Sequence, residues 1–399
     1  MEKVIIVGGG PAGLFCAFKL LERGYSVELY EQTTAVGKKF LVAGNGGLNL
    51  THSEDLEPFS KRYGQCSRLF YELLQEFGPK DLRSFFSELG VETFVGTSGR
   101  VFPKNIKASE ILKRWVDKLK ADKNFKLFAR HSLIEIREEQ LIFKSKGELI
   151  EVPFEKAILG LGGASWKRTG SDGKWKQLLE KLGVEIKEFL PMNCGFETKW
   201  STFFIESVDR APLKNVGISF QNHRLRGELM LTPFGLEGGG IYAISNFIRE
   251  EILLNGSAEI HLDLKPDLDL DEVKKRLIKR GKKTSMSNHL RKSLGISKNH
   301  NILLKELVAK EDYNNPEQLA LNIKSLKVVL QTTRPIEEAI STSGGVALSE
   351  VNANFQLKKL PGVYVIGEML DFEAPTGGYL LQASFSTAWR ALGSFKKGF

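Results

Sequence analysis

Hydrophobic and polar residues follow a strand, helix, strand order at the start of the chain. Residues 3–7 are a short β-branched run, residues 11–23 show helical periodicity, and residues 25–30 form a second strand-like run that ends at Glu31. This order predicts a βαβ unit with two parallel strands and a crossover helix.

Further strand-like runs occupy residues 126–136, 141–143, 156–161 and 362–366, and the last run is followed by Gly367. An apolar-periodic helix is expected from Tyr379 to about Leu392. Glycine therefore gathers just after predicted strands, which is the pattern of an α/β protein with a ligand at its strand ends.

The middle of the chain has a different pattern. Short strands and turns dominate between about residues 190 and 256, whereas residues 271–326 are charged, periodic and helical. We therefore expect inserted material within the α/β domain: a β-rich part followed by a small helical part.

Composition places the chain of 399 residues among soluble globular proteins and excludes disordered, fibrous and membrane-spanning classes. The 39 glycines accompany only 13 prolines, so they do not indicate linkers. The apolar segment 4–21 is interrupted by Gly8–Pro11 and lacks a following cleavage signal, so we expect it to be mature structure. The net charge of +9 favours anionic ligands without distinguishing phosphates, nucleic acid and membrane surfaces.

Three cysteines, Cys16, Cys66 and Cys194, contain no C-x-x-C pair, and the six histidines never fall at metal-ligand spacing. We expect neither disulfides nor a metal site, and a cytoplasmic location. A thiol relay of the disulfide-reductase kind is not expected either.

The segment Gly8-Gly9-Gly10-Pro11-Ala12-Gly13 matches the dinucleotide fingerprint G-x-G-x-x-G between a predicted strand and a predicted helix. Gly8 allows the tight turn, Gly10 lets the backbone approach a pyrophosphate, and Gly13 allows close packing of helix and strand. Glu31 is placed to accept from a ribose hydroxyl and would repel a 2′-phosphate. The bound dinucleotide should therefore be FAD or NAD rather than NADP.

Two other segments are candidates for phosphate or flavin contacts. Residues 37–51 combine Lys38 and Lys39 with four glycines and two asparagines, which suits a loop around phosphate or flavin and equally a solvated surface loop. Gly367-Glu368 follows a strand, and Thr376-Gly377-Gly378-Tyr379 opens a helix whose positive end would favour an anionic reduced flavin. The alternative is a plain strand, turn and helix. Gly162-Gly163 lacks the third glycine and is not a second fingerprint.

With these segments the chain resembles, over nearly its whole length, the bacterial FAD-dependent oxidoreductases of the aminoacetone-oxidase-like, bile-acid-reductase-like (BaiN-type) family. Its landmarks are 8–13 with Glu31, 37–51, 98–103, 162–165, 343–346, 367–371 and 376–379. Two positions depart from the broader family: Gly47-Leu48-Asn49 stands where Arg-Cys-Asn is usual, and Leu380 where Asn is common.

The resemblance implies a Rossmann-like FAD domain of the two-dinucleotide-binding type, an inserted β-barrel-like domain and a small helical domain. We expect the FAD-binding domain at residues 1–190 and 335–399, the β-rich domain at 191–265 and 323–334, and the helical subdomain at 266–322. This division agrees with the changes in pattern described above.

The resemblance also assigns roles along FAD. Gly8 to Gly13 and Glu31 would hold the ADP half, Lys39 and Asn49 would lie along FAD, Glu368, Gly377 and Gly378 would approach the ribityl and flavin, and the Leu133 backbone would meet adenine. The full set of predicted cofactor-binding residues is Gly8, Gly10, Pro11, Ala12, Gly13, Glu31, Lys38, Lys39, Gly46, Asn49, Leu133, Gly162, Gly367, Glu368, Gly377, Gly378 and Tyr379.

The predicted function is that of an FAD-dependent oxidoreductase acting on an unidentified small organic molecule, with NAD(P)H as a transient reductant. No acid–base constellation is evident. The substrate-side candidates are Arg100, Trp166, Arg168 and Tyr242, because they lie in or beside glycine-rich loops; packing or a surface ion pair is the more common role of such residues.

Two rival hypotheses remain. An FAD-dependent tRNA-modifying enzyme would use the basic helical insert, which carries Lys274, Lys275, Arg276, Lys279, Arg280, Lys282, Lys283, Arg291 and Lys292. Against nucleic acid as a partner, that insert has no Phe, Tyr or Trp between its cations to stack on bases. The other rival is a flavoprotein in which FAD is only a structural ligand or redox sensor. The sequence leaves the oligomeric state open.

Overall fold

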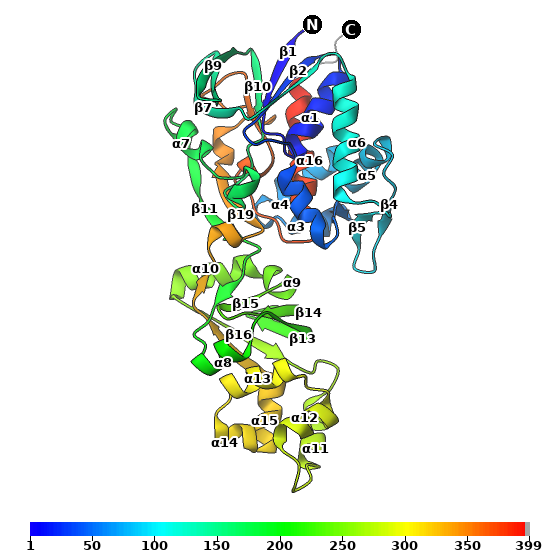
Figure 1. The fold of residues 1–399 in the computed structure, drawn as a ribbon, viewed down its shortest axis with the longest axis vertical. Helices are drawn as coiled ribbons and strands as arrows, with labels where there is room; N and C mark the ends of the chain where they lie inside the picture. The colour runs from blue at the N-terminus through cyan, green and yellow to red at the C-terminus, as the bar shows by residue number, and fades with distance from the viewer. Residues whose placement is uncertain (396–399) are drawn as a thin grey trace. The chain divides into compact units, whose positions relative to one another are not determined.

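The computed structural model describes residues 1–395 and contains two compact units (Figure 1). Unit 1 comprises Met1–Leu190 together with the chain from Ile340 onward, and unit 2 comprises Pro191–Ala339. Each unit has its own hydrophobic core and is described separately.

Unit 1 is built on a parallel sheet with the strand order β20-β10-β1-β2-β6. The strands are β1 (Lys3–Val7), β2 (Ser26–Glu31), β6 (Phe125–Ala129), β10 (Lys156–Leu159) and β20 (Val363–Val365). The last strand comes from the C-terminal part of the sequence, so both ends of the chain contribute to one sheet.

Residues of this sheet alternate between two cores. Val4 and Ile6 of β1 belong to one hydrophobic cluster with α1, whereas Ile5 and Val7 belong to another on the opposite face. Because side chains along a strand point to alternate faces, a nearly continuous apolar strand must be covered on both sides. This explains why the sequence of β1 shows no hydrophobic–polar alternation.

Helices and small sheets surround the parallel sheet. The helices are α1 (Pro11–Glu22), α2 (Lys38–Ala43), α3 (Leu56–Lys61), α4 (Ser67–Glu76), α5 (Pro79–Glu88), α6 (Ala108–Ala121), α7 (Trp175–Glu180) and α16 (Tyr379–Ala391). The small sheets contain β3 (Thr51–His52), β5 (Arg100–Pro103) and β4 (Thr93–Val95); β7 (Ser132–Ile136), β8 (Gln140–Ser145) and β9 (Glu148–Pro153); and β11 (Ile186–Met192) with β19 (Ser341–Val346).

Unit 2 contains a seven-stranded antiparallel sheet in the order β17-β16-β13-β14-β15-β12-β18. Its strands are β12 (Phe196–Glu197), β13 (Ala211–Phe220), β14 (His223–Leu231), β15 (Gly235–Glu237), β16 (Ala258–Asp263), β17 (Leu326–Leu330) and β18 (Thr332–Thr333). The two edge strands, β17 and β18, are separated in sequence by Gln331 alone, so the sheet is nearly closed into a barrel.

Helices complete unit 2: α8 (Thr202–Ser207), α9 (Gly239–Tyr242), α10 (Ser245–Asn255), α11 (Leu270–Ile278), α12 (Met286–Leu294), α13 (Lys298–Leu307), α14 (Lys310–Asn314) and α15 (Pro316–Lys324). Helices α11 to α15 share one core with the barrel-like sheet. The α/β class, the inserted barrel-like sheet and the helical part predicted from the sequence are thus confirmed.

One local prediction is wrong. The run 126–136 is not one strand, because Arg130, with a φ of 62°, turns the chain between β6 and β7. In the segment 190–256 the predicted short strands are present, and the helices α8, α9 and α10 lie between and after them. Among residues 1–395 no helix is long and apolar enough to cross a membrane.

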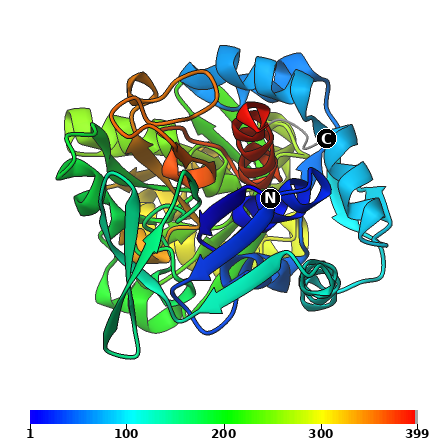
Figure 2. The same ribbon diagram turned by 90° about the horizontal axis from the view of Figure 1, so that it is seen from above.

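Helix α16 joins the C-terminal part of unit 1 to its N-terminal part, and Figure 2 shows it in red beside the blue N-terminal elements. It packs against α1 and β3. Where β3 meets α16, the Thr51 hydroxyl donates to Gln382 Oε1 (2.7 Å). Gln382 Nε2 in turn donates to the Phe77 carbonyl (3.0 Å). Gly378, which precedes α16, has a φ of +91°, and a Cβ there would lie 2.6 Å from the Thr51 backbone.

Replacement of Gly378 by alanine is expected to destabilise unit 1 strongly, because the new methyl group meets main chain that no rotamer change can move. Gly24 is the matched control, since its φ is +84° but nothing lies within 4 Å of its Cβ position. Gly24→Ala should cost about 1 kcal/mol from the left-handed backbone alone, and Gly378→Ala a further ~1–3 kcal/mol from overpacking. Urea unfolding of both variants measures the difference; equal losses would contradict the close contact.

Candidate nucleotide-binding site

The first glycine motif forms a turn in which main chain packs on main chain. A Cβ on Gly8, whose φ is +106°, would lie 2.3 Å from the Gly160 carbonyl oxygen, and a Cβ on Gly13 would lie 2.1 Å from the Gly8 carbonyl oxygen. The turn therefore brings β1, β10 and the start of α1 together more closely than any side chain permits. This matches the roles predicted for Gly8 and Gly13.

Gly10 is different, because no atom lies within 4 Å of its Cβ position. It is the N-cap residue of α1, no side chain caps that end, and Pro11 occupies the first turn, followed by buried Ala12. The first turn of a helix has unpaired N–H groups and a positive partial charge. Gly10 therefore combines open space with the positive partial charge of the α1 N-terminus, which are the two features that a bound anionic group needs.

Glu31 lies at the end of β2 and is buried. Its Oε2 accepts from the Gly9 N–H at 2.9 Å, and its Oε1 accepts from the Thr33 N–H at 2.7 Å. A carboxylate has four lone-pair positions, so each oxygen retains one for a ligand hydroxyl. The carboxylate is fixed beside the turn as the fingerprint predicts.

The second segment connects to the C-terminal one through a partly buried ion pair. Lys39 Nζ of α2 lies 2.6 Å from Glu368 Oε2 and 3.0 Å from Ser165 Oγ. Glu368 also accepts from the N–H groups of Thr342 (3.1 Å) and Gly163 (3.4 Å). Three segments that are far apart in sequence therefore meet at one carboxylate. Lys38, the neighbouring candidate, is half-buried.

Asn49 has a buried side-chain oxygen, Oδ1, that finds no hydrogen-bond partner among the described residues. A buried acceptor without a partner costs free energy, typically about 1–3 kcal/mol. Gly46, three residues earlier, has nothing within 4 Å of its Cβ position. The glycine-rich loop thus presents an unsatisfied acceptor and open space, which fits a bound polar group.

At the start of α16 a polar network holds the Gly377-Gly378 turn. The Tyr379 hydroxyl donates to Glu54 Oε1 at 2.5 Å, and Arg62 donates to both Glu54 oxygens at 3.2 and 2.9 Å. His52 stacks on the Tyr379 ring with centroids 5.5 Å apart. The Tyr63 hydroxyl donates to the Tyr379 carbonyl at 2.8 Å.

The tautomer of His52 follows from its partners. Nδ1 lies 3.1 Å from the Glu54 N–H, which can only donate, so Nδ1 accepts and carries no proton. Nε2 lies 2.9 Å from the Ser98 carbonyl oxygen and must therefore carry the proton. Main-chain groups thus hold both ring nitrogens of His52.

Titration in this network is set by burial and by pairing. Burial raises the pKa of Glu54, but hydrogen bonds from Arg62 and Tyr379 outweigh it and hold that pKa below its usual value. Burial and the nearby Glu54 carboxylate raise the pKa of Tyr379. Burial also raises the pKa of Cys66 to about 11 and that of Cys194 to about 12. The two thiols are thus poor nucleophiles near neutral pH.

The remaining cofactor candidates lie on defined elements. Gly162 accepts from Trp175 Nε1 through its carbonyl (2.8 Å), and the Gly367 N–H donates to Thr387 Oγ1 (3.0 Å). Leu133 is half-buried in β7, opposite Phe143.

The substrate-side candidates lie on separate elements of the two units. Arg100 is exposed at the start of β5, pairs with His52 in the strand register and is close enough to Tyr379 to lower its pKa. Trp166 is 36% exposed with a φ of 62°, and Arg168 is exposed two residues later. Such a backbone is uncommon for a bulky residue and marks sites under functional constraint. Tyr242 belongs to unit 2, where it is half-buried in α9.

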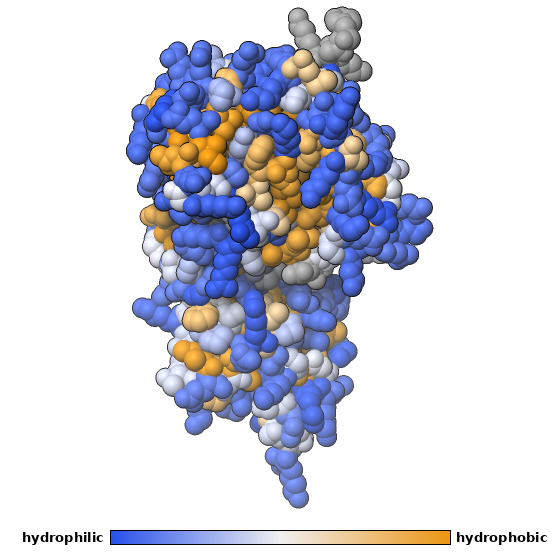
Figure 3. Space-filling view, turned by 45° about the horizontal axis from the view of Figure 1, so that its top comes forward, coloured by the Kyte–Doolittle hydropathy of each residue, from blue (hydrophilic) through white to orange (hydrophobic). Residues whose placement is uncertain are grey.

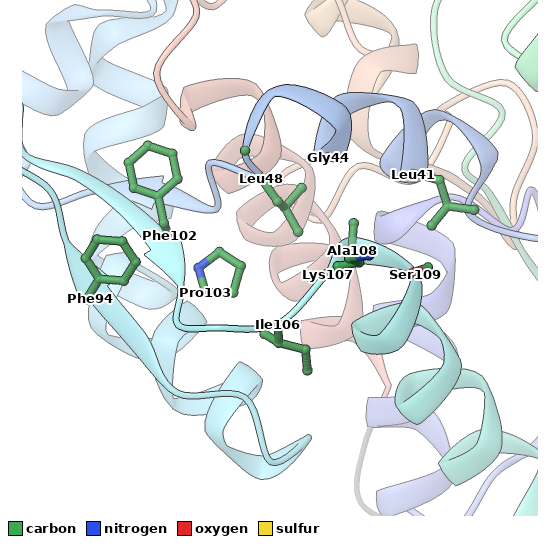
Figure 4. Close-up of a pocket in the computed structure, with 11 residues that line it drawn as sticks. Leu41, Gly44, Leu48, Phe94, Phe102, Pro103, Ile106, Lys107, Ala108 and Ser109 are labelled. Carbon is green, nitrogen blue, oxygen red and sulfur yellow. The ribbon is translucent and has the colours of Figure 1, made fainter.

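A pocket of about 590 Å³ opens beside the glycine-rich loop of unit 1 (Figure 4). The loop contributes Leu41, Gly44, Gly47 and Leu48, and the facing segment contributes Phe94, Phe102, Pro103, Ile106, Lys107, Ala108 and Ser109. Its lining holds a single titratable group, Lys107, and is otherwise mainly apolar. The pocket supplies volume rather than acid–base chemistry.

Sequence reasoning missed the groups that support the site. Glu54, Arg62, Tyr63 and His52 belong to no motif, and their spacing gives no signal of the network at Tyr379. Thr342 is missed as well, although the neighbouring run Ser343-Gly344-Gly345-Val346 was noticed.

Glu54→Gln should remove the low-pKa carboxylate while keeping the side chain's shape. Because the folded-state pKa of Glu54 is depressed, its stabilisation is present above the unfolded pKa and is lost as the pH falls. The variant's free energy of unfolding should therefore be lower than that of wild type by about 1–3 kcal/mol at pH ~7. This difference should become smaller below pH ~4. Urea unfolding at both pH values tests this.

The control is Glu57→Gln, which removes only the exposed pair with Lys61 and should leave stability unchanged within error. If the difference in free energy of unfolding between wild type and Glu54→Gln does not change with pH, the ionised Glu54 carboxylate does not stabilise the network.

Comparison with known proteins gives a consistent result. The model of the family described as "HI0933-like protein Rossmann domain" matches residues 2–394. The chain is 25% identical to a 3-dehydro-bile acid delta(4,6)-reductase of Clostridium scindens, over 98% of each chain. It is 24% identical to a ribosomal RNA dihydrouridine synthase of Escherichia coli, over 96% of each chain.

Solved structures share the fold. A 3-ketosteroid-delta4-(5alpha)-dehydrogenase from Rhodococcus jostii aligns with a TM-score of 0.53 at 12% identity, covering 98% of this chain and 96% of that one. A flavocytochrome c3 fumarate reductase aligns with a TM-score of 0.53 at 14% identity, covering 98% and 77%. The expectation of an FAD-dependent oxidoreductase is confirmed. The protein belongs to the HI0933-like Rossmann family.

Proposed function

We propose that this FAD-dependent oxidoreductase reduces a carbon–carbon double bond conjugated to a carbonyl group. The observation that carries the proposal is the meeting of three glycine-rich segments at the Lys39–Glu368 pair, together with the unsatisfied Asn49 acceptor of the glycine-rich loop. These features suit a flavin dinucleotide, and nothing in the set suits thiol or metal chemistry.

The reaction class is supported by two relatives that align over nearly their whole length. One is named a delta(4,6)-reductase of 3-dehydro-bile acids and the other a dihydrouridine synthase. Both names describe addition of two hydrogens across a double bond, which in each of those substrates is conjugated to a carbonyl. The shared reaction class is therefore better supported than either substrate.

In this proposal the chain's two ends hold FAD. The α1 N-terminus and Gly10 bind the pyrophosphate, and Glu31 accepts from the ribose. Lys39 and Glu368 meet the ribityl region, Asn49 Oδ1 accepts from a flavin or ribityl donor, and the start of α16 faces the flavin ring. The Leu133 backbone contacts the adenine.

When bound and reduced, FAD would supply the hydride for the substrate carbon remote from the carbonyl group, and the neighbouring carbon would take the second hydrogen as a proton from solvent. The chain's own part is to orient the substrate and to stabilise the negative charge that develops on the carbonyl oxygen. Arg100, exposed beside His52 and Tyr379, is the candidate for that charge, because a guanidinium is a strong fixed donor. The Tyr379 proton stays on the hydroxyl, since burial and Glu54 raise its pKa.

The electron source proposed with this reaction is NAD(P)H, bound transiently. The chain has a single dinucleotide fingerprint, so a second nucleotide would not be a resident cofactor. A cytoplasmic location belongs to the same proposal, because NAD(P)H is generated there.

Asn49→Leu is expected to separate FAD binding from folding. Removing an unpaired buried acceptor should leave the apoprotein's free energy of unfolding unchanged or raise it by up to about 1 kcal/mol. The same substitution should lower the affinity for FAD roughly tenfold, because one hydrogen bond to the ligand is lost. Denaturant unfolding of the apoprotein and fluorescence titration with FAD measure the two effects.

Asn288→Leu, on the exposed surface of α12 in unit 2, is the control for the substitution itself and should change neither quantity. A destabilised Asn49→Leu apoprotein with unchanged FAD affinity would show that Asn49 has only a structural role.

The reaction itself is tested anaerobically. Enzyme whose flavin has been photoreduced is mixed with a cyclic enone, a 3-oxo-Δ4 steroid or uridine, and the return of oxidised flavin absorbance is followed. One substrate should reoxidise the flavin stoichiometrically and gain two hydrogens by mass spectrometry. A parallel titration of oxidised enzyme with NADH and NADPH identifies the reductant.

Arg100→Met should slow reoxidation by the substrate while leaving reduction by NAD(P)H unchanged. Reoxidation by oxygen alone, with every unsaturated carbonyl compound inert, would contradict the proposal and indicate an oxidase. A flavin that resists all donors and acceptors would indicate a sensor.

A further inference from the structure

The pocket beside the glycine-rich loop of unit 1 is not used by the predicted FAD contacts. None of the described residues that line it belongs to the set predicted to bind the cofactor. The loop 37–51 contributes other members to its wall: Leu41, Gly44, Gly47 and Leu48. The same loop therefore borders a cavity that FAD, held as predicted, leaves open to another molecule.

The size and the wall of this pocket suit a small organic ligand. Its volume of about 590 Å³ lies in the range of small-molecule sites, roughly 300–1,000 Å³. Phe94 and Phe102 line it side by side, with ring centroids 5.9 Å apart and an interplanar angle of 33°. The hydrophobic surface of unit 1, orange in Figure 3, lies among hydrophilic residues. Phe94 is 46% exposed, so a ligand that covers it removes apolar surface from water.

One end of the pocket carries uncompensated positive charge. Figure 4 shows Lys107, Ala108 and Ser109 together where the chain enters α6. Lys107 is the exposed N-cap residue of this helix, and no side chain caps the helix there. Its ammonium group has no ion pair and no hydrogen bond within residues 1–395. The charge of Lys107 thus adds to the positive partial charge at the N-terminus of a 14-residue helix.

The acidic side chains of the adjoining elements do not neutralise Lys107. Glu110, in the first turn of α6, pairs with Arg114 at 2.6 Å, and Glu92, just before β4, pairs with Lys104 at 3.2 Å. No acidic residue is among the described residues that line the pocket. A molecule that satisfies this pocket therefore has an apolar body and a negative charge at one end.

The available charge favours a carboxylate over a phosphate. One lysine and one helix N-terminus balance roughly one negative charge, whereas a phosphate monoester carries about −1.5 to −2 at neutral pH. The neighbouring rings of Phe94 and Phe102 favour an aromatic body, because tilted and offset ring contacts add stabilisation beyond the burial of area. A cationic ligand would meet Lys107 with a like charge. These features together select an aromatic carboxylate.

We propose that the pocket is a second ligand site of this protein, which binds an aromatic carboxylate. The ring of the ligand lies against Phe94 and Phe102. Its carboxylate accepts hydrogen bonds from Lys107 and from the unpaired N–H groups in the first turn of α6. This site does not depend on the proposed reaction, because its lining residues are separate from the predicted FAD contacts.

Equilibrium dialysis of the FAD-loaded protein tests the role of charge with two compounds of the same shape, the naphthoate anion and neutral naphthamide. Naphthoate should bind about tenfold more tightly, since its carboxylate gains charge-assisted hydrogen bonds. Lys107→Gln should lower the affinity for naphthoate about tenfold and keep the affinity for naphthamide within about twofold of wild type. Equal affinities of wild type for the two compounds would overturn the proposal.

The matched control for charge is Lys120→Gln. Lys120 is exposed on the last turn of α6, has no ion pair within the described chain, and lies about 18 Å along the helix from Ala108. This variant should keep the wild-type affinity for both compounds. Equal losses of naphthoate affinity in the two variants would reduce the effect to net charge and overturn the assignment to Lys107.

Phe94→Ala tests the contact with the ring. The variant should lose affinity for naphthoate and naphthamide alike, by about fivefold, because the same apolar contact is removed from both. The control is Val95→Ala, since Val95 follows Phe94 on β4, is 45% exposed and is not among the lining residues. This control should bind both compounds as wild type does. An unchanged affinity of Phe94→Ala for both compounds would overturn the placement of the ring.

Release of flavin distinguishes this site from the cofactor site. Saturating naphthoate should release no FAD during the dialysis. Released FAD would mean that the two ligands compete for one site and would overturn the proposal of a second one. Because the readout is binding alone, an enzyme that reduces no conjugated double bond contradicts the proposed function and leaves this site unaffected.

Discussion

Contact between main-chain atoms, with no side chain between them, is the constraint on which unit 1 depends. Gly8, Gly13 and Gly160 bring β1, β10 and α1 together, and Gly378 sets the start of α16 against the backbone of Thr51. Backbone packing of this kind cannot be relaxed by choosing another rotamer. It therefore fixes the positions of the helix N-termini, which are the elements that a dinucleotide needs most.

The same constraint explains why the site is assembled from both ends of the chain. Glu368 comes from the C-terminal part, yet its carboxylate is held by Lys39 and by the Thr342 and Gly163 N–H groups. The Thr51–Gln382 hydrogen bond and the Tyr379–Glu54 pair repeat this pattern a few residues away. Such buried polar bonds cost little when every partner is present and much when one is missing. Folding of unit 1 and formation of the site are thus one event.

The sequence predicts the parts of this arrangement that depend on local pattern. The fingerprint, the strands β1 and β2, and helix α16 follow from periodicity and from glycine spacing, and Glu31 follows from its place at a strand end. The network of Glu54, Arg62 and His52 could not be foreseen, because these three neighbours reach Tyr379 only when β3 packs against α16. The turn at Arg130 was also not predicted, although Arg130, His131 and Ser132 interrupt the apolar run between Ala129 and Leu133.

Net charge shows why a composition value can mislead until the fold is known. A charge of +9 spread over the surface would indicate general solubility and weak attraction to any anion. Here unit 1 carries +6 and unit 2 carries +3, and unit 2 combines ten cations between residues 274 and 298 with a net charge of −7 over its other residues. The unit that carries the dinucleotide fingerprint therefore also carries the larger part of the net charge. Substitutions among the cations of residues 274–298 leave the glycine turns of unit 1 untouched, because those cations belong to the other unit.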